Sequence, residues 1–220
     1  MLSKHHKYPS TPHLPFSPEK HKDDRDHKDP LFFIGKEVVV TEKLDGGNTC
    51  IHAGLVYART VGLPTNHGSF TYIKNAYAHL TLGDSYNIYY GENLQGIHSI
   101  DYVEVEDYFY LFAARHLFDD VFFSWDKVNE LAKDKFKVVP VLFRGEFSNY
   151  TKMEKWMEEE IKKPSTMNPS APKEGFVIRI ADEFHAKDFS MNVAKYVRRG
   201  HVQSGEHWKR NWKTQKLIKK

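Results

Sequence analysis

The chain has 220 residues, of which 40% are hydrophobic and 14% aromatic, so it can bury the core of a globular protein. No stretch reaches the roughly 18 consecutive apolar residues of a membrane helix, and the N-terminus lacks the apolar segment of a secretory signal. A single cysteine, Cys50, excludes an internal disulfide framework. We therefore expect a cytoplasmic protein without membrane contact.

The net charge of +3 is unevenly distributed along the chain. Residues 195–220 contain nine Lys or Arg and one acid, which gives this tail a net charge of +8. Such a tail favours an anionic partner, nucleic acid first, although a solvated end of a helix explains the charge equally well.

The first segment in chain order is a leader at residues 1–30, rich in His, Pro, Asp and Lys. Four prolines between residues 9 and 18 exclude a regular helix, so we expect an extended leader with Leu14 and Phe16 as anchors. The five leader histidines lack the tight spacing of metal ligands, and we expect them to be solvated.

The body, residues 31–200, mixes strands and helices without strict alternation. Apolar residues at helical spacing predict helices over 69–81, after a cap at Ser124, and over 153–161. Apolar and β-branched runs predict strands at 38–41, 48–53, 55–60, 88–90, 108–113, 138–143, 176–180 and 193–197. Pro140 interrupts one of these strands, which predicts an edge or a bulge there. This order favours an α+β fold with antiparallel sheets.

The stretch Glu42-Lys43-Leu44-Asp45-Gly46-Gly47-Asn48 is unusual because a predicted strand delivers its lysine into a glycine turn. A lysine amine that is buried or crowded by cations loses proton affinity and becomes a nucleophile near neutral pH. Asp45 adds a carboxylate, and the two glycines let the backbone approach a ligand closely. Alone, the four-residue pattern is short enough to arise by chance.

Five later stretches place charged or aromatic residues at or near probable strands. In chain order they carry Arg59, Glu92, Phe112, Glu174, and the pair Lys195 and Arg198. The cations suit a phosphate, the carboxylates suit a metal or a ribose, and the aromatic ring suits a base. Each residue taken singly also fits a surface salt bridge, a turn or the core.

In this order the motifs resemble those of the covalent nucleotidyltransferase superfamily, and within it the ATP-dependent RNA ligases. The resemblance covers residues 41–198 and implies a nucleotidyltransferase domain in which Lys43 becomes joined to AMP. Asn48, five residues after that lysine, is a feature shared with RNA ligases. The pieces Thr11–Pro15, His98–Ile100 and His201–Gln203 also look like a bacterial and viral branch of these ligases.

The resemblance implies a role for each site residue. Lys43 is the expected nucleophile, and Glu174 and Glu92 are the expected ligands of magnesium or manganese, with Glu92 also suited to the ribose. Glu42 is expected to read the adenine and Phe112 to stack on it. The other residues expected to bind ATP are Asp45, Gly46, Asn48, Arg59, Lys195 and Arg198.

The motif that begins at Lys195 departs from the family pattern of Lys-x-Lys. Val197 occupies the position of the second lysine, and Arg198 follows it. Adjacent strand residues point to opposite faces. Either the strand bulges or ends so that Arg198 turns inward, or another residue supplies the second cation.

The implied reaction joins RNA ends in three steps. Lys43 takes AMP from ATP, the AMP passes to a 5′-phosphate, and a 3′-hydroxyl then displaces it to seal the strand. Residues 201–220 are expected to form a basic helix with Trp208 and Trp212, packed on the same domain, because too few residues follow Arg198 for an OB-fold.

The expected protein is therefore a monomeric RNA ligase that uses ATP and a divalent metal and binds RNA 5′-phosphate and 3′-hydroxyl ends. Three alternatives remain open at this point. The same chemistry would serve a DNA nick ligase, and an RNA-end-binding module with decayed chemistry would keep the fold. The protein could also accumulate an adenylylated donor and need a partner for joining.

Overall fold

The computed structural model describes residues 2–20, 22, 24–80, 85–201 and 213–218. The contacts of the chain group into two compact units. Unit 1 comprises Met1–Tyr8, Asp45–Val138 and Ser204–Lys220, and unit 2 comprises Pro9–Leu44 and Val139–Gln203. The leader from Pro9 onward groups with unit 2, and the domain boundaries expected at residues 30 and 200 stay a prediction.

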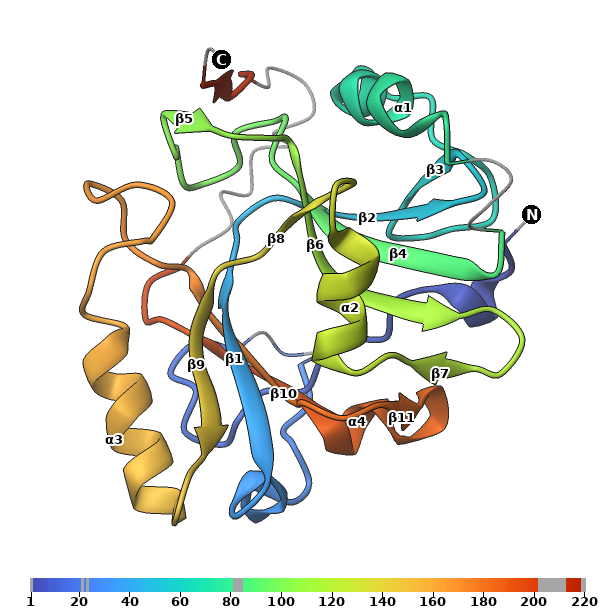
Figure 1. The fold of residues 1–220 in the computed structure, drawn as a ribbon. Helices are drawn as coiled ribbons and strands as arrows, with labels where there is room; N and C mark the ends of the chain where they lie inside the picture. The colour runs from blue at the N-terminus through green and yellow to red at the C-terminus, as the bar shows by residue number, and fades with distance from the viewer. Residues whose placement is uncertain (1, 21, 23, 81–84, 202–212, 219–220) are drawn as a thin grey trace. The chain divides into compact units, whose positions relative to one another are not determined.

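Unit 2 is built on a four-stranded antiparallel sheet in the order β12-β10-β1-β9 (Figure 1). The strands are β1 (Glu37–Lys43), β9 (Val141–Glu146), β10 (Gly175–Ile180) and β12 (Val193–Val197). The run Val38-Val39-Val40 favours an extended backbone, and all three side chains are fully buried. The predicted interruption at Pro140 is confirmed, since β9 begins only at Val141.

Helix α3 (Tyr150–Glu160) covers one face of this sheet. Asn149 caps the helix by accepting a hydrogen bond from Lys152 N at 2.9 Å. Met153 and Met157, one helical turn apart, are fully buried in a cluster that includes Val38, Val40, Phe176, Ile178 and Tyr196. Since strand side chains alternate, the odd-numbered residues of β1, Thr41 and Lys43 among them, lie on the opposite face.

The leader completes the core of unit 2. Leu14 is fully buried, and the ring of Phe16 packs against Tyr150 and Tyr196, so both predicted anchors are confirmed. The expectation of solvated leader histidines is wrong for His13 and His27, which are 1% and 2% exposed. Unit 2 also contains η2 (Pro30–Phe33), β11 (Phe184–His185), η4 (Ala186–Asp188) and α4 (Phe189–Asn192).

Unit 1 contains an antiparallel array in the order β7-β6-β4-β2-β3, which β8 extends by parallel pairing with β6. These strands are β2 (Gly47–His52), β3 (Leu55–Ala58), β4 (Asn87–Asn93), β6 (Phe109–His116), β7 (Val121–Phe122) and β8 (Lys137–Val138). The helical elements are η1 (Lys4–His6), η3 (Gly68–Phe70), α1 (Thr71–Tyr77) and α2 (Trp125–Ala132), with Ser124 as the predicted cap of α2. The predicted α+β class with antiparallel sheets is confirmed.

The C-terminal tail differs from its prediction where it is described. Lys216–Leu217 form a short strand, β13, which pairs in parallel with β5 (Glu104–Val105), so the expected helix is wrong there. Trp208 and Trp212 lie outside the described residues. Among the described residues no helix has the length and apolarity needed to span a membrane.

The leader's place in the core predicts that Leu14→Ala destabilises the protein by about 2–5 kcal/mol, because it removes a fully buried side chain. Leu31→Ala is the matched control, since Leu31 lies in η2, just after the leader, and is 60% exposed. Urea unfolding measures both. Equal losses of stability in the two variants would contradict the buried position of Leu14.

Candidate active site

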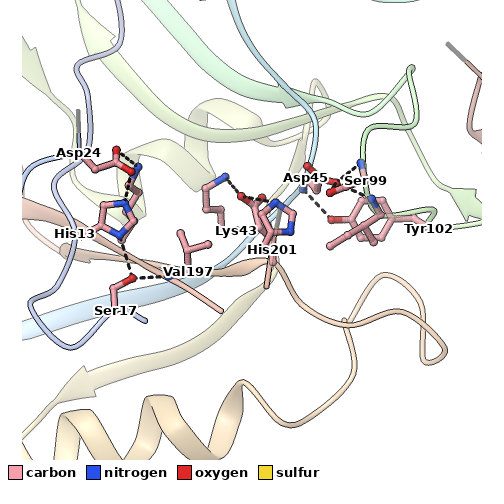
Figure 2. Close-up of polar contacts among 12 residues, drawn as sticks. His13, Ser17, Asp24, Lys43, Asp45, Ser99, Tyr102, Val197 and His201 are labelled. Atoms are coloured by element: carbon pink, nitrogen blue, oxygen red, sulfur yellow. Dashed lines mark hydrogen bonds and ion pairs between the residues drawn. The ribbon is translucent and has the colours of Figure 1, made fainter. Parts of the chain in front are cut away.

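Lys43 is the last residue of β1, where its Cα pairs with that of Gly175 on β10. Its Nζ lies 2.7 Å from Oε1 of Glu174, the residue that precedes β10. Lys43 and His201, which both contact this carboxylate, are labelled in Figure 2. The side chain of Lys43 is 26% exposed, whereas that of Glu174 is 4% exposed. The lysine is therefore held by a buried carboxylate and still reaches the surface of unit 2.

Glu174 has one oxygen that is bonded and one that is not. His201 Nε2 lies 3.2 Å from Oε1, while Oε2 is buried without a hydrogen-bond partner among the described residues. Burial alone would raise the pKa of Glu174, but Lys43 and His201 outweigh it and lower that pKa. The carboxylate is therefore ionised at neutral pH, and its unbonded oxygen suits a hard divalent cation.

Position 175 has no room for a side chain, because β12 passes very close to its backbone. A Cβ on Gly175 would lie 1.9 Å from the carbonyl oxygen of Tyr196. Beyond the paired strands, Arg198 N donates to the carbonyl oxygen of Glu174 at 3.0 Å. The Glu-Gly pair is thus fixed by backbone contacts on the β12 side.

Lys195 lies on the same face of the sheet as Lys43. Its Cα pairs with Val177, which pairs in turn with Thr41, two residues before Lys43. Lys195 Nζ lies 3.1 Å from Oδ1 of Asp24, a residue of the leader that is not part of any of the motifs. The two lysines and Glu174 are the predicted site residues that unit 2 gathers on this face.

Arg198 follows the end of β12 at Val197. Val197 is 7% exposed. Because β12 ends at this residue, the alternation of strand side chains stops before Arg198, as is required if Arg198 is to turn inward and supply the second cation. Arg198 Nε is buried without a hydrogen-bond partner among the described residues, while Nη1 donates to Arg199 O at 3.4 Å. A role of Arg198 toward phosphate stays a prediction.

Glu42 lies on the face of the sheet that α3 covers, opposite Phe176. Its carboxylate accepts hydrogen bonds from Thr166 N at 2.9 Å and from the hydroxyl groups of Thr166 and Ser165, at 2.6 and 2.5 Å. Glu42 thus holds the loop after α3 in place by hydrogen bonds. The contact with adenine expected for Glu42 stays a prediction.

Lys173, which is 1% exposed, holds the base of the same loop. Its Nζ donates to Pro164 O at 2.7 Å and lies 3.2 Å from Glu160 Oε1. These bonds fix the residue immediately before Glu174.

In unit 1, Asp45 forms hydrogen bonds with the loop that contains Ser99 and Ile100. Its Oδ2 accepts from Ser99 N at 2.8 Å, Ser99 Oγ at 2.7 Å and Ile100 N at 2.6 Å, and Asp45 N donates to Tyr102 Oη at 2.8 Å. This role differs from the expected contact with ATP, which stays a prediction. Gly46 leaves no room for a side chain, because a Cβ there would lie 2.5 Å from Asn93 O.

Asn48 and Glu92 share one face of the unit 1 sheet, where their Cα atoms pair across β2 and β4. Asn48 Oδ1 is buried without a hydrogen-bond partner among the described residues, and Glu92 is half-buried. These neighbouring oxygens fit a ribose, a cation or a phosphate bound through water. Arg59, by contrast, is exposed just beyond β3.

Phe112 lies in a bulge of β6, because Gly91 pairs with Leu111 and Tyr90 pairs with Ala113. The bulge turns the Phe112 ring to the face that carries Tyr90, since both rings contact Tyr8, with centroids 4.9 and 5.2 Å away. Stacking of Phe112 on adenine stays a prediction.

Sequence reasoning missed several residues that support the site, namely Ser17, Asp24, Ser165, Thr166 and Lys173. His13, Ser99 and His201 lay within the three pieces that resemble a branch of RNA ligases, but no role had been inferred for them. Asp24, Ser165 and Thr166 carry no sequence signal, because the site residues that they contact, Lys195 and Glu42, are more than 100 residues away in sequence.

The family model described as RNA ligase matches residues 36–197, most of the chain, and this protein belongs to that family. No curated protein matches the chain.

Solved structures of an RNA ligase from Naegleria gruberi are similar in fold. A mutant without ligand has a TM-score of 0.58 at 16% identity, over 94% of this chain and 63% of that one. The ligase with pyrophosphate has a TM-score of 0.56 at 17% identity, over 94% and 63%. A mutant with ATP and Mn has a TM-score of 0.57 at 16% identity, over 78% and 52%. The chain thus spans between about half and 63% of those chains.

The close approach at Gly46 predicts that Gly46→Ala lowers the free energy of unfolding by about 1–3 kcal/mol, because the new methyl group meets backbone. Gly47→Ala is the matched control, since a Cβ on Gly47 would have no neighbour nearer than 4.0 Å. Urea unfolding measures both variants. If Gly46→Ala is as stable as Gly47→Ala, the turn is not as tight as described.

Proposed function

We propose that this protein is an ATP-dependent RNA ligase that uses Lys43 as its nucleophile. The observation that carries the proposal is the 2.7 Å contact between Lys43 Nζ and the buried Glu174, on the sheet face that also carries Lys195. It supports the proposal because phosphoryl transfer needs a nucleophile held in place and cations that neutralise phosphate charge. Membership in the RNA ligase family supports the same conclusion.

In the first step Lys43 Nζ attacks the α-phosphorus of ATP. A bond forms between nitrogen and phosphorus, the bond from the α-phosphorus to the bridging oxygen breaks, and pyrophosphate leaves. The amine gives up one proton to solvent before the attack, because only a neutral nitrogen has the electron pair for it, and a second when the nitrogen–phosphorus bond has formed. The product is AMP bound to Lys43 as a phosphoramidate.

Two further steps join the RNA. The 5′-phosphate of one strand displaces Lys43 and takes the AMP, which regenerates the free amine. The 3′-hydroxyl of the other strand then attacks the 5′-phosphate, and AMP leaves with the electrons of the broken pyrophosphate bond. Lys195 stabilises the charge on the phosphates through these steps.

Glu174 of unit 2 is proposed as a ligand of a divalent cation, magnesium or manganese, and the same role for Glu92 of unit 1 stays a prediction. The fit rests on the ionised, buried Glu174, whose Oε2 lacks a hydrogen-bond partner among the described residues. A bound cation supplies positive charge to the phosphate oxygens. Phe112 is assigned to stacking on the adenine, and Asn48, Arg59 and Arg198 to phosphates.

Replacing the nucleophile tests the first step. We expect Lys43→Ala to abolish the transfer of label from α-labelled ATP to the protein, because no other amine takes its place. Lys155→Ala is the control, since Lys155 is an exposed lysine of α3, and it should label like wild type. A labelled Lys43→Ala protein would mean that the nucleophile is assigned wrongly.

The polynucleotide class is tested with 5′-phosphorylated substrates of different structure. With ATP and magnesium, we expect sealing of RNA ends, detected by gel electrophoresis, and little or no sealing of the matched DNA nick. Preferred sealing of the DNA nick would favour the DNA ligase alternative. Adenylylated RNA that accumulates without sealing would indicate that joining needs a partner.

A further inference from the structure

The leader segment around His13 extends the unit 2 sheet beyond β12. Lys195 N donates to Pro12 O at 2.8 Å, which joins this segment to β12. On its other side, His13 N donates to Arg25 O and His27 N donates to His13 O, each at 2.7 Å. His13 is therefore fixed by backbone hydrogen bonds between Lys195 and a second leader segment.

A line of hydrogen bonds connects Val197 to Lys195 through leader side chains (Figure 2). Val197 N donates to Ser17 Oγ at 3.0 Å, and Ser17 Oγ lies 2.9 Å from His13 Nδ1. On the other side of the ring, His13 Nε2 lies 3.0 Å from Asp24 Oδ2. The second oxygen of Asp24, Oδ1, lies 3.1 Å from Lys195 Nζ.

These distances fix where the protons lie when the imidazole is neutral. Nε2 must carry the ring proton, because an unprotonated nitrogen would face a carboxylate oxygen with no proton between them. Nδ1 then accepts the hydroxyl proton of Ser17, whose oxygen is left to accept from Val197 N. Each group in the line therefore has a donor facing an acceptor, and Asp24 is held at both of its oxygens.

His13 is 1% exposed and neutral at physiological pH. Burial lowers its pKa most, Lys195 and Lys20 lower it further, and Asp24 opposes them, with a resulting pKa of about 4. A neutral ring does not compete with Lys195 for the charge of Asp24. The carboxylate is therefore the counter-ion of the lysine and the hydrogen-bond acceptor of the histidine.

We propose that His13 and Asp24 are positioning residues that hold Lys195, in its charged form, at the place where it meets the phosphates of ATP. This inference rests on the phosphate-binding role given to Lys195 in the proposed function. An ammonium group has three N–H donors, and the bond to Asp24 uses one of them. A nearby carboxylate also favours the protonated lysine.

The opposite idea is that Asp24 blocks Lys195 and must leave before ATP binds. The bond from His13 argues against it, because His13 is fixed on both sides by backbone and anchors the carboxylate. The two ideas predict opposite effects of Asp24→Asn. Loss of a positioning group weakens the use of ATP, whereas loss of a blocking group strengthens ATP binding.

The test measures labelling of the full-length protein over a range of ATP concentrations. We expect Asp24→Asn to lower kcat/KM for ATP about tenfold, chiefly by raising KM, as is usual for residues that orient a ligand. Asp26→Asn is the matched control, since Asp26 pairs with Lys20 at 2.6 Å in the same leader, and it should change kcat/KM less than about twofold.

The histidine is tested by a pair of substitutions. His13→Gln keeps an N–H donor that can reach Asp24, whereas His13→Ala removes it. We expect the glutamine variant to keep more of the wild-type kcat/KM for ATP than the alanine variant. Urea unfolding of both variants separates this difference from a loss of folding.

Combining Asp24→Asn with Lys195→Met tests whether Asp24 acts through Lys195. In the Lys195→Met background we expect Asp24→Asn to change kcat/KM less than about twofold, because the lysine it positions is gone. An additive tenfold loss would overturn the proposal. A lower KM for ATP in Asp24→Asn alone would also overturn it and favour the blocking role.

The outcomes separate this inference from the proposed function. A wild-type protein that takes no label refutes the proposed function. A protein that labels, but whose Asp24→Asn variant behaves like Asp26→Asn, refutes only the positioning role. An NMR titration is independent of activity: Lys195→Met should raise the pKa of His13 above about 4, because it removes a neighbouring cation. An unchanged titration would contradict the coupling.

Discussion

The contact on which the proposed chemistry depends is the ion pair between Lys43 and Glu174, 2.7 Å from nitrogen to oxygen. It follows from the antiparallel register of β1 and β10, which sets Lys43 opposite Gly175 and so beside Glu174. A slip of one residue would turn Lys43 toward α3 and bury its charge in the apolar cluster. The absence of a side chain at Gly175 then allows β12 to bring Lys195 onto the same face.

The supporting contacts follow one pattern. The residue next to each reactive side chain in the sequence is a buried polar residue that hydrogen-bonds to the loop after α3. Glu42, next to Lys43, binds Ser165 and Thr166 of the loop after α3. Lys173, next to Glu174, binds backbone carbonyls at the base of that loop. Burying a polar group is costly unless it is hydrogen-bonded, so these contacts hold the reactive side chains within a narrow range of positions.

Much of this could be predicted from the sequence because its signals are local. The α+β class follows from strand and helix patterns within short windows, and the resemblance to RNA ligases follows from motifs of a few residues. The partners Asp24 and Ser165 could not be predicted, because they meet Lys195 and Glu42 only through the fold. The same limit explains two errors. The leader histidines were judged by composition, although His13 is buried beside β12 and His27 beside α4. Lys216–Leu217 pairs with β5 instead of continuing a helix.

In the proposed reaction Lys43 forms a covalent bond with AMP while Glu174 binds the cation. Mass-spectrometric peptide mapping of the protein after incubation with ATP and magnesium tests it most directly. We expect one adenylate, located on the peptide that carries Lys43, and none when a chelator removes the magnesium or when Glu174 is replaced by alanine. An adenylate on another residue, or an unmodified protein under the complete conditions, would contradict it.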